Sequence, residues 1–183
     1  MLLALPVWAD DICEDHWLTR NAIFDRAGHC FGSPLGQAIF DNSDCTASLS
    51  LSKRDESSIA EIRAFERELG CKVDTSKTAL SLSDLSVRLR LAAFPIRDIF
   101  ESGCIGYLGE TVPLFAGLTG SSAQVGAITR GDFVLSSHLS RQGADGRMWS
   151  YYTIWPNGNG TAAMKGAGWT PAPVFSTCRQ VAG

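Results

Sequence analysis

The sequence predicts an α+β protein in which a small, disulfide-tied helical module is followed by a small β-barrel module. Runs with helix-capping signals and helical apolar spacing occupy the first part of the chain, and short β-rich runs between glycine-containing turns occupy the second. The six cysteines form an even set, which pairs readily in an oxidising compartment. We place the module boundary near residue 104, with the helical module over residues 10–103 and the β-barrel module over residues 104–183.

The composition excludes several classes of partner. Of the 183 residues, 45% are apolar and 19% are charged, so the chain can bury an ordinary core. The net charge of −3 provides no basic footprint for nucleic acid or for an acidic membrane surface. Because no stretch approaches the about 20 apolar residues of a membrane span, we expect no transmembrane helix.

Residues 1–9, MLLALPVWA, have the pattern of the end of a signal peptide. A short apolar run closes on Val7-Trp8-Ala9, with small residues at the two positions that signal peptidase inspects. We expect the mature chain to begin at Asp10 and to be periplasmic or secreted. The alternative for residues 1–9 is a buried N-terminal strand.

Two helices are predicted in the first forty residues. Asp11 and Glu14 have the spacing of a capping box at a helix start, and Gly28 is placed to end that helix in a left-handed conformation. Ser33 followed by Pro34 then predicts the N-terminus of a short second helix.

A third helix is predicted from Ser58 and Glu61, which form a second capping box, to a stop at Gly70. Its expected buried stripe consists of Ile59, Ile62, Phe65 and Leu69. For residues 82–94, the alternation of leucine and valine with serine and arginine favours a strand, and helical spacing of the leucines leaves a helix as the alternative.

From about Cys104 onward, short β-rich runs are separated by turn sequences. The runs are TVPLFAG, GDFVLSSHL, MWSYYTIW and GWTPAPVF, and the turns between them include TGSS, RQGADG and PNGNG. Strands at this spacing predict a small barrel or sandwich.

Four segments of the second module match, in order, the pattern of bacterial SH3-like domains. They are Gly120-Ser121-Ser122, Gly126 to Val134 with an Arg-Gly-Asp turn, Met148 to Tyr152 with a central tryptophan, and Gly168-Trp169-Thr170. The module therefore resembles that family over roughly residues 110–175. The resemblance implies an SH3-like β-barrel that recognises a peptide segment or peptidoglycan.

The first module contains an Arg-Asn pair followed by an aromatic residue, an arginine and a glycine. These are Arg20, Asn21, Phe24, Arg26 and Gly28, and in this order they resemble the YARHG domain of bacterial extracellular proteins. The resemblance implies a structural signature at the end of a helix.

Two groups of residues are candidate binding sites. Arg20, Asn21 and Arg26 can hold an anionic ligand through guanidinium hydrogen bonds, although helix stapling and the helix dipole favour a structural role for them. In the run YYTIW, alternate residues point to opposite faces of a strand, so Tyr152 and Trp155 are candidates for an outward-facing aromatic contact.

No catalytic, metal or cofactor site is predicted. The histidines, His16, His29 and His138, are scattered, and no Cys-x-x-Cys pair occurs. A cysteine nucleophile requires a free thiol of low pKa, which an even cysteine set in an exported chain does not leave.

The expected disulfides all lie within one module. One bridge ties the ends of the first two helices, with a loop of about 15 residues worth roughly 3 kcal/mol. One joins the first and last strands, which are neighbours in a closed barrel, and the remaining pair fastens the first helix to the third. The pairs are Cys30–Cys45, Cys104–Cys178 and Cys13–Cys71.

These observations predict an exported, non-enzymatic binding or adaptor protein that recognises a cell-envelope component, either a protein segment or peptidoglycan. One alternative is a secreted or periplasmic inhibitor or immunity-type protein. A second is a cell-wall hydrolase, for which the sequence offers no nucleophile and base.

Overall fold

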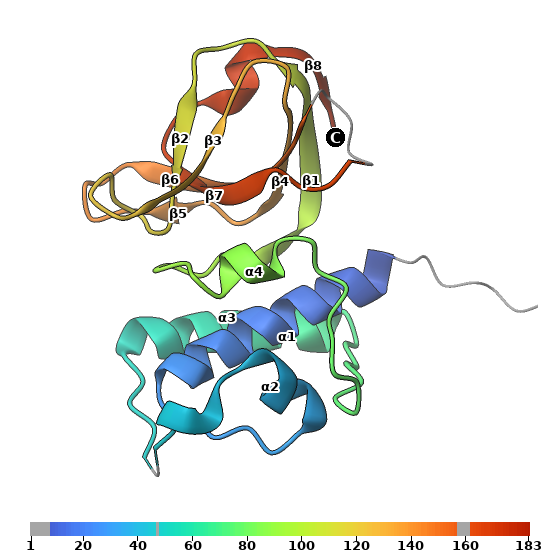
Figure 1. The fold of residues 1–183 in the computed structure, drawn as a ribbon, viewed down its shortest axis with the longest axis vertical. Helices are drawn as coiled ribbons and strands as arrows, with labels where there is room; N and C mark the ends of the chain where they lie inside the picture. The colour runs from blue at the N-terminus through green and yellow to red at the C-terminus, as the bar shows by residue number, and fades with distance from the viewer. Residues whose placement is uncertain (1–7, 47, 157–161) are drawn as a thin grey trace, which may run out of the picture. The chain divides into compact units, whose positions relative to one another are not determined.

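A computed structural model describes residues 8–46, 48–156 and 162–183 and divides the chain into two compact units, Met1–Leu82 and Ser83–Gly183. Figure 1 shows helices in the first unit and mostly strands in the second. The expected signal segment lies largely outside the described residues, because only Trp8 and Ala9 of it are described, at the start of a helix. The mixed helix and sheet content confirms the predicted α+β class.

The first unit is built on the helix α1 (Trp8–Arg26). The helix begins before Asp11, so the predicted capping box of Asp11 and Glu14 is wrong, and Glu14 instead accepts a hydrogen bond from the backbone N–H of Ser81 at 2.7 Å. The stop at Gly28 is where it was predicted, with a positive φ of 91° that glycine adopts without strain.

The short helix α2 (Pro34–Ile39) starts as its sequence predicts. The Ser33 hydroxyl accepts a hydrogen bond from the backbone N–H of Gly36 at 3.2 Å, and Pro34 occupies the first turn, where its missing N–H costs nothing. A 3₁₀ turn (Asn42–Asp44) follows.

The helix α3 (Lys53–Glu68) begins six residues earlier than predicted, so Ser58 and Glu61 lie inside it. Ser52 and Asp55 form the capping box instead: the backbone N–H of Asp55 donates to the Ser52 hydroxyl at 3.2 Å, and that of Ser52 donates to the Asp55 carboxylate at 3.1 Å. Both pairs have the required spacing, and the upstream pair adds six residues of helix.

The buried apolar stripe of α3 includes fewer residues than predicted. Ile59 and Ile62 are buried, as expected from the sequence, and the helix stops at Gly70 with a φ of 65°. Leu69 was predicted to be buried and is 41% exposed. It is the C-cap residue of the helix, where the apolar stripe no longer faces α1.

Among the described residues, the second unit contains a short α-helix, α4 (Leu85–Arg88), where the sequence favoured a strand, and a 3₁₀ turn, η3 (Val174–Thr177). The backbone N–H groups of Val87 and Arg88 both donate to the carbonyl of Asp84 at 2.9 Å, which closes a helical turn. The unit begins at Ser83, upstream of the boundary placed at residue 104, because this segment bonds to the sheet: the Trp169 indole donates to the carbonyl of Ala93 at 2.8 Å.

Eight strands form one antiparallel sheet in the described residues. They are β1 (Arg97–Tyr107), β2 (Val112–Phe115), β3 (Gln124–Ile128), β4 (Phe133–His138), β5 (Arg141–Gln142), β6 (Met148–Trp155), β7 (Gly166–Thr170) and β8 (Cys178–Ala182). Their order is β3-β2-β7-β6-β4-β1-β8, with β5 paired to β6.

The sheet is open rather than closed, since β3 and β8 are edge strands among the described residues. The first and last strands do pair, with Cys104 opposite Val181 and Tyr107 opposite Cys178. Strand spacing in a sequence reports strand length, whereas closure depends on pairing between distant strands. The ribbon of the second unit curls around an interior (Figure 1). Buried aromatic and aliphatic side chains, among them Trp149 and Trp169, pack together in its core.

The structure contains three disulfides, and their pairing is the one expected from the sequence. Cα–Cα distances are 5.3 Å for Cys13–Cys71, 5.1 Å for Cys30–Cys45 and 5.4 Å for Cys104–Cys178. Each bridge lies within one unit, so no bridge joins the two.

The position of the α3 capping box generates a prediction with a built-in control. Ser52→Ala removes the side-chain acceptor of the N-cap and should lower the free energy of unfolding by about 1 kcal/mol. Ser58→Ala, at the predicted but unused cap, replaces serine by a better helix former and should change it by less than about 0.5 kcal/mol. Urea unfolding with intact disulfides, followed by circular dichroism at 222 nm, measures both; a larger loss for Ser58→Ala would contradict the observed helix start.

Candidate functional site

The arginine that opens the YARHG-like motif holds two helices together. Arg20 lies on α1, and its Nε donates to both carboxylate oxygens of Glu66 on α3 at 3.1 Å. Its Nη2 lies 3.0 Å from Glu66 Oε1, and both side chains are about four-fifths buried. Such a two-pronged pair fixes the approach of the helices, so the Arg20 guanidinium is occupied by protein rather than open to a ligand.

The other two candidates of the first unit differ from Arg20. Asn21 is buried, and its amide donates to the carbonyl of Trp17 at 2.7 Å within the same helix. Arg26 is the last residue of α1 and is exposed. The three residues therefore do not converge on one ligand position: one staples helices, one is internal to α1 and one reaches solvent.

The motif glycine shapes the loop that follows α1. The carbonyl of Gly28 accepts a hydrogen bond from the backbone N–H of Thr46 at 2.8 Å, beside the Cys30–Cys45 bridge. A Cβ at Gly28 would collide with the Thr46 hydroxyl. Gly28 is thus required both by its positive φ and by the close approach of the returning chain.

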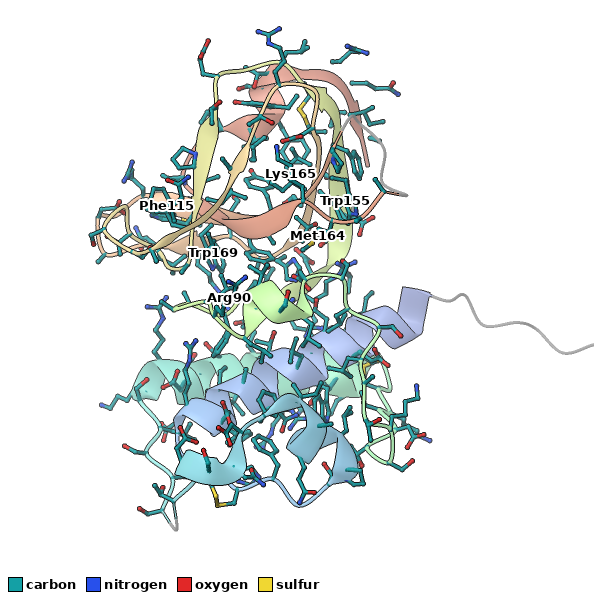
Figure 2. The ribbon with its side chains drawn as sticks, in the orientation of Figure 1. Arg90, Phe115, Trp155, Met164, Lys165 and Trp169 are labelled. Atoms are coloured by element: carbon teal, nitrogen blue, oxygen red, sulfur yellow. A yellow bond between two sulfur atoms is a disulfide. The ribbon has the colours of Figure 1, made fainter. Side chains whose placement is uncertain are left out.

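The aromatic candidates of the second unit mainly serve packing. Tyr152 is buried, and its ring centroid lies 5.9 Å from that of Phe175. Trp155, labelled in Figure 2, is half-buried and lies 5.7 Å from the ring of Phe133, its partner across β4 and β6. Trp155 therefore retains some exposed aromatic surface, whereas Tyr152 does not.

A buried polar cluster, which the sequence did not predict, joins α4 to the sheet. Arg88 is only 1% exposed, and its Nη1 lies 3.4 Å from Asp84 Oδ2 and 3.1 Å from His138 Nε2. The Tyr151 hydroxyl donates to the same Asp84 oxygen at 2.9 Å. A buried charge needs this kind of pairing, and the cluster anchors α4 against β4 and β6.

The Arg130-Gly131-Asp132 turn also has a structural role. Asp132 is buried, accepts a hydrogen bond from the backbone N–H of Thr129 at 2.7 Å, and lies 2.6 Å from the ammonium group of Lys165. Figure 2 labels Lys165. The carboxylate of Asp132 is therefore satisfied within the unit.

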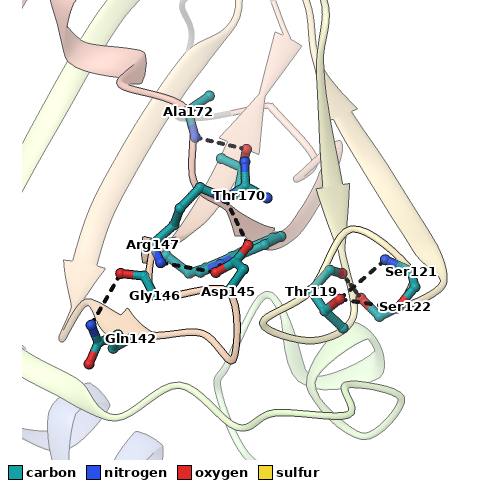
Figure 3. A network of polar contacts seen from close by, with 10 residues as sticks. Thr119, Ser121, Ser122, Gln142, Asp145, Gly146, Arg147, Thr170 and Ala172 are labelled. Atoms are coloured by element: carbon teal, nitrogen blue, oxygen red, sulfur yellow. Dashed lines mark hydrogen bonds and ion pairs between the residues drawn. The ribbon is translucent and has the colours of Figure 1, made fainter.

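A second set of polar contacts organises the loops at one end of the sheet (Figure 3). In the turn between β5 and β6, the Arg147 guanidinium donates to Asp145 at 2.7 Å, and this bond is the largest cause of a lowered pKa of the Asp145 carboxyl. In the turn between β2 and β3, the Ser122 hydroxyl donates to the carbonyl of Thr119 at 2.7 Å. These contacts lie within each turn, so they fix loop shape.

Phe100, the most exposed large apolar side chain among the described residues, lies on β1. Between Arg97 and Ser102 the register with β4 shifts, and Ile99 and Phe100 in this bulge are 53% and 74% exposed. The carboxylate of Asp98 accepts the backbone N–H of Ile99 at 2.7 Å, which holds the bulge. β8 pairs with β1 only from Gly103 to Tyr107, so the bulged half of β1 has no strand on that side among the described residues.

The sequence did not predict the apolar bulge, because the residue types of Ile99 and Phe100 do not show that their side chains are exposed. The segment RDIFES alternates polar and apolar pairs, which fits neither strand nor helix periodicity, and this irregularity was the available signal. In the described part of the chain, His, Cys, Asp and Glu side chains do not gather in threes at a spacing suited to a metal ion. None of the described helices combines the length and apolar character needed to cross a membrane.

Gly28 provides a test of the structural role of the first motif. Gly28→Ala should lower the free energy of unfolding by about 1–3 kcal/mol, because alanine is strained at this φ and meets Thr46. Gly32→Ala is the matched control, since a Cβ there has no atom within 4 Å and no positive φ, and it should be neutral or stabilising by up to about 1 kcal/mol. Thermal unfolding of both variants measures the two changes in stability. Equal changes for Gly28→Ala and Gly32→Ala would contradict a special structural role of Gly28.

Burial of Tyr152 predicts a loss of stability at alkaline pH. Desolvation raises the pKa of its phenol above the ordinary value, and a hydrogen bond with Ser150 opposes this in part. The folded state holds the phenol neutral, so this stability is present below about pH 10 and is lost as pH rises through the raised pKa. Tyr152→Phe should therefore reduce the fall in Tm between pH 9 and pH 11, measured together with tyrosinate absorbance at 295 nm. An unchanged fall would show that Tyr152 is not the responsible group.

Comparison with known families divides the chain into two matched regions. The YARHG domain matches residues 6–67, which confirms the resemblance carried by Arg20, Asn21, Phe24, Arg26 and Gly28. This match and the three disulfides fit an exported protein. A search of curated proteins and a search of solved structures each found no match.

The second region is matched by a domain of unknown function, DUF4453, over residues 70–183. The matched region begins upstream of residue 104 and includes α4 together with the whole sheet. Since this match covers more than half of the chain, the protein belongs to the DUF4453 family.

Proposed function

We propose that this protein is an exported, non-enzymatic binding protein of the periplasm, and that its sheet unit recognises an extended segment of a cell-envelope protein. The observation that carries this proposal is the exposed pair Ile99 and Phe100 on the bulge of β1, beside the edge strand β8. The inhibitor alternative makes the same physical demand, since it also requires a protein-binding surface.

A partner that covers Ile99 and Phe100 gains free energy from burying their apolar side chains. Covering an exposed Phe or Ile side chain is worth about 1.5–3 kcal/mol each. Val181, on the edge strand β8 that pairs with β1, is also more than half exposed. Large aromatic side chains of this kind often contribute most of the binding energy in an interface.

The backbone next to this pair favours an extended partner. The outer edge of β8 lies where another strand can pair through main-chain hydrogen bonds. It adjoins the bulge of β1, where the backbone N–H groups of Ile99 and Phe100 donate to Asp98. A partner added in this way gains affinity from its backbone and specificity from the side chains that meet Ile99 and Phe100. This geometry supports a protein segment more than a glycan.

The SH3-like resemblance contributes to this proposal only through the fold of the sheet unit. Its motif segments fall on consecutive parts of the sheet: Gly120-Ser121-Ser122 between β2 and β3, the Arg-Gly-Asp turn between β3 and β4, Trp149 in β6 and Trp169 in β7. We propose that β2 to β7 form an SH3-like core to which β1 and β8 are added. The proposed docking edge lies on these added strands.

Photocrosslinking in the native host tests the proposed function. The full chain carries p-benzoylphenylalanine at position 100 or, as a matched control, at Met148, which is exposed and apolar but lies on β6. We expect a protein adduct from position 100 and not from position 148. Ile99→Asp should reduce the adduct at position 100 about tenfold or more, because it places a charge in the apolar contact.

The same experiment identifies the outcomes that contradict the proposal. Identical adducts from both positions, or an adduct that persists with Ile99→Asp, would show that the bulge is not the docking surface. Co-sedimentation of the mature chain with purified sacculi, lost in Phe100→Asp, would identify peptidoglycan as the ligand in place of a protein segment.

A further inference from the structure

A hollow with a basic lining lies at the C-terminal end of α3, in the first unit. It has a volume of about 330 Å³ and is lined by Arg63, Glu66, Arg67, Gly70, Cys71 and Lys72. This volume is at the lower end of the range for small-molecule sites, about 300–1,000 Å³. Three of the six residues are cations and one is an acid.

The acid of the hollow is already neutralised. Glu66 receives both prongs of Arg20, which leaves its carboxylate little capacity to balance the neighbouring cations. In the described part of the chain, neither Arg67 nor Lys72 forms an ion pair. The surrounding unit is acidic overall, with eight Lys and Arg against thirteen Asp and Glu in residues 1–82, whereas the lining of the hollow has three cations and one acid.

The helix dipole accounts for only part of this arrangement. Cations in the last turn of a helix interact favourably with its negative end, which explains Arg67. Lys72 lies beyond the helix, after Gly70, and the guanidinium of Arg63 lies 5.9 Å from the ring centroid of Phe24 on α1. The dipole therefore does not account for Lys72, whereas the contact with the Phe24 ring accounts for the position of the Arg63 guanidinium.

The walls of the hollow are held in place by bonds to α1. Cys71 is bridged to Cys13, and Glu66 is paired with Arg20, so both the end of α3 and the turn after it are tied to the first helix. Sites whose supporting groups are fixed before binding lose less conformational entropy when a ligand arrives. The hollow is therefore preorganised although its cations are exposed.

We propose that this hollow binds the phosphate group of a phosphate ester. Arginine presents paired N–H donors that match phosphate oxygens, and lysine adds a point charge. A phosphate monoester carries close to two negative charges at neutral pH, which Arg63, Arg67 and Lys72 together offset, whereas one carboxylate would leave more of their charge uncompensated. This site goes beyond the proposed protein-binding function, because it lies in the other unit and does not involve Phe100.

Titration of the mature full chain with inorganic phosphate at low ionic strength tests the site. Amide ¹H–¹⁵N spectra should show saturable shifts within residues 63–72. The double variant R67Q/K72Q should weaken this binding about tenfold or more, the loss expected for one or more charge-assisted hydrogen bonds. The matched control K53Q/R54Q removes two exposed charges from the N-terminal end of the same helix and should bind as the wild type does.

Two further arms distinguish the source of the phosphate. Co-sedimentation with vesicles that contain phosphatidic acid, whose headgroup is a phosphate monoester, but not with phosphatidylcholine vesicles, lost in R67Q/K72Q and kept in K53Q/R54Q, would identify a lipid headgroup. Saturable phosphate binding without vesicle binding would identify a small soluble phosphate ester. The proposal is overturned by the absence of a saturable shift, by equal weakening in both double variants, or by equally tight binding of acetate.

Discussion

The three disulfides are the constraint on which the exposed features of this protein depend. Each unit is small and buries a limited core, so cross-links that restrict the unfolded chain contribute a large share of its stability. Each bridge also lies beside a feature discussed above: Cys71 lines the basic hollow, Cys178 joins the edge strand β8 to β1, and Cys30 closes the loop that begins at Gly28. Exposed groups on these segments keep a defined position that burial alone would not impose.

Local signals in the sequence predicted the features that local physics decides. Ser33 with Pro34 and the two stop glycines were placed correctly, because a cap depends on only a few neighbouring residues. The start of α3 was misplaced because Ser52 and Ser58 both head a valid capping pattern, and the pattern does not rank them. The choice is decided by the additional helix that the upstream cap permits.

Features decided by distant contacts were not predictable. In residues 85–91 the arginines alternate with apolar residues, which implies that they face solvent, yet Arg88 is buried. It is buried because Asp84 and His138 supply partners, and His138 lies fifty residues away. The same contacts join this segment to the sheet and thereby place the start of the second unit upstream of residue 104. Periodicity carries no information about such pairs.

In the first unit, the role of an arginine depends on whether a carboxylate is available to pair with it. The motif made Arg20 a ligand-binding candidate. In the structure it forms an ion pair with Glu66 that links α1 to α3. That pairing occupies the carboxylate that would otherwise neutralise Arg67 and Lys72. Neither of these two residues belongs to the motif. The motif arginine therefore acts on the electrostatics of the hollow without facing a ligand itself. A sequence signature can in this way mark the support of a site while the residues that form the site remain unmarked.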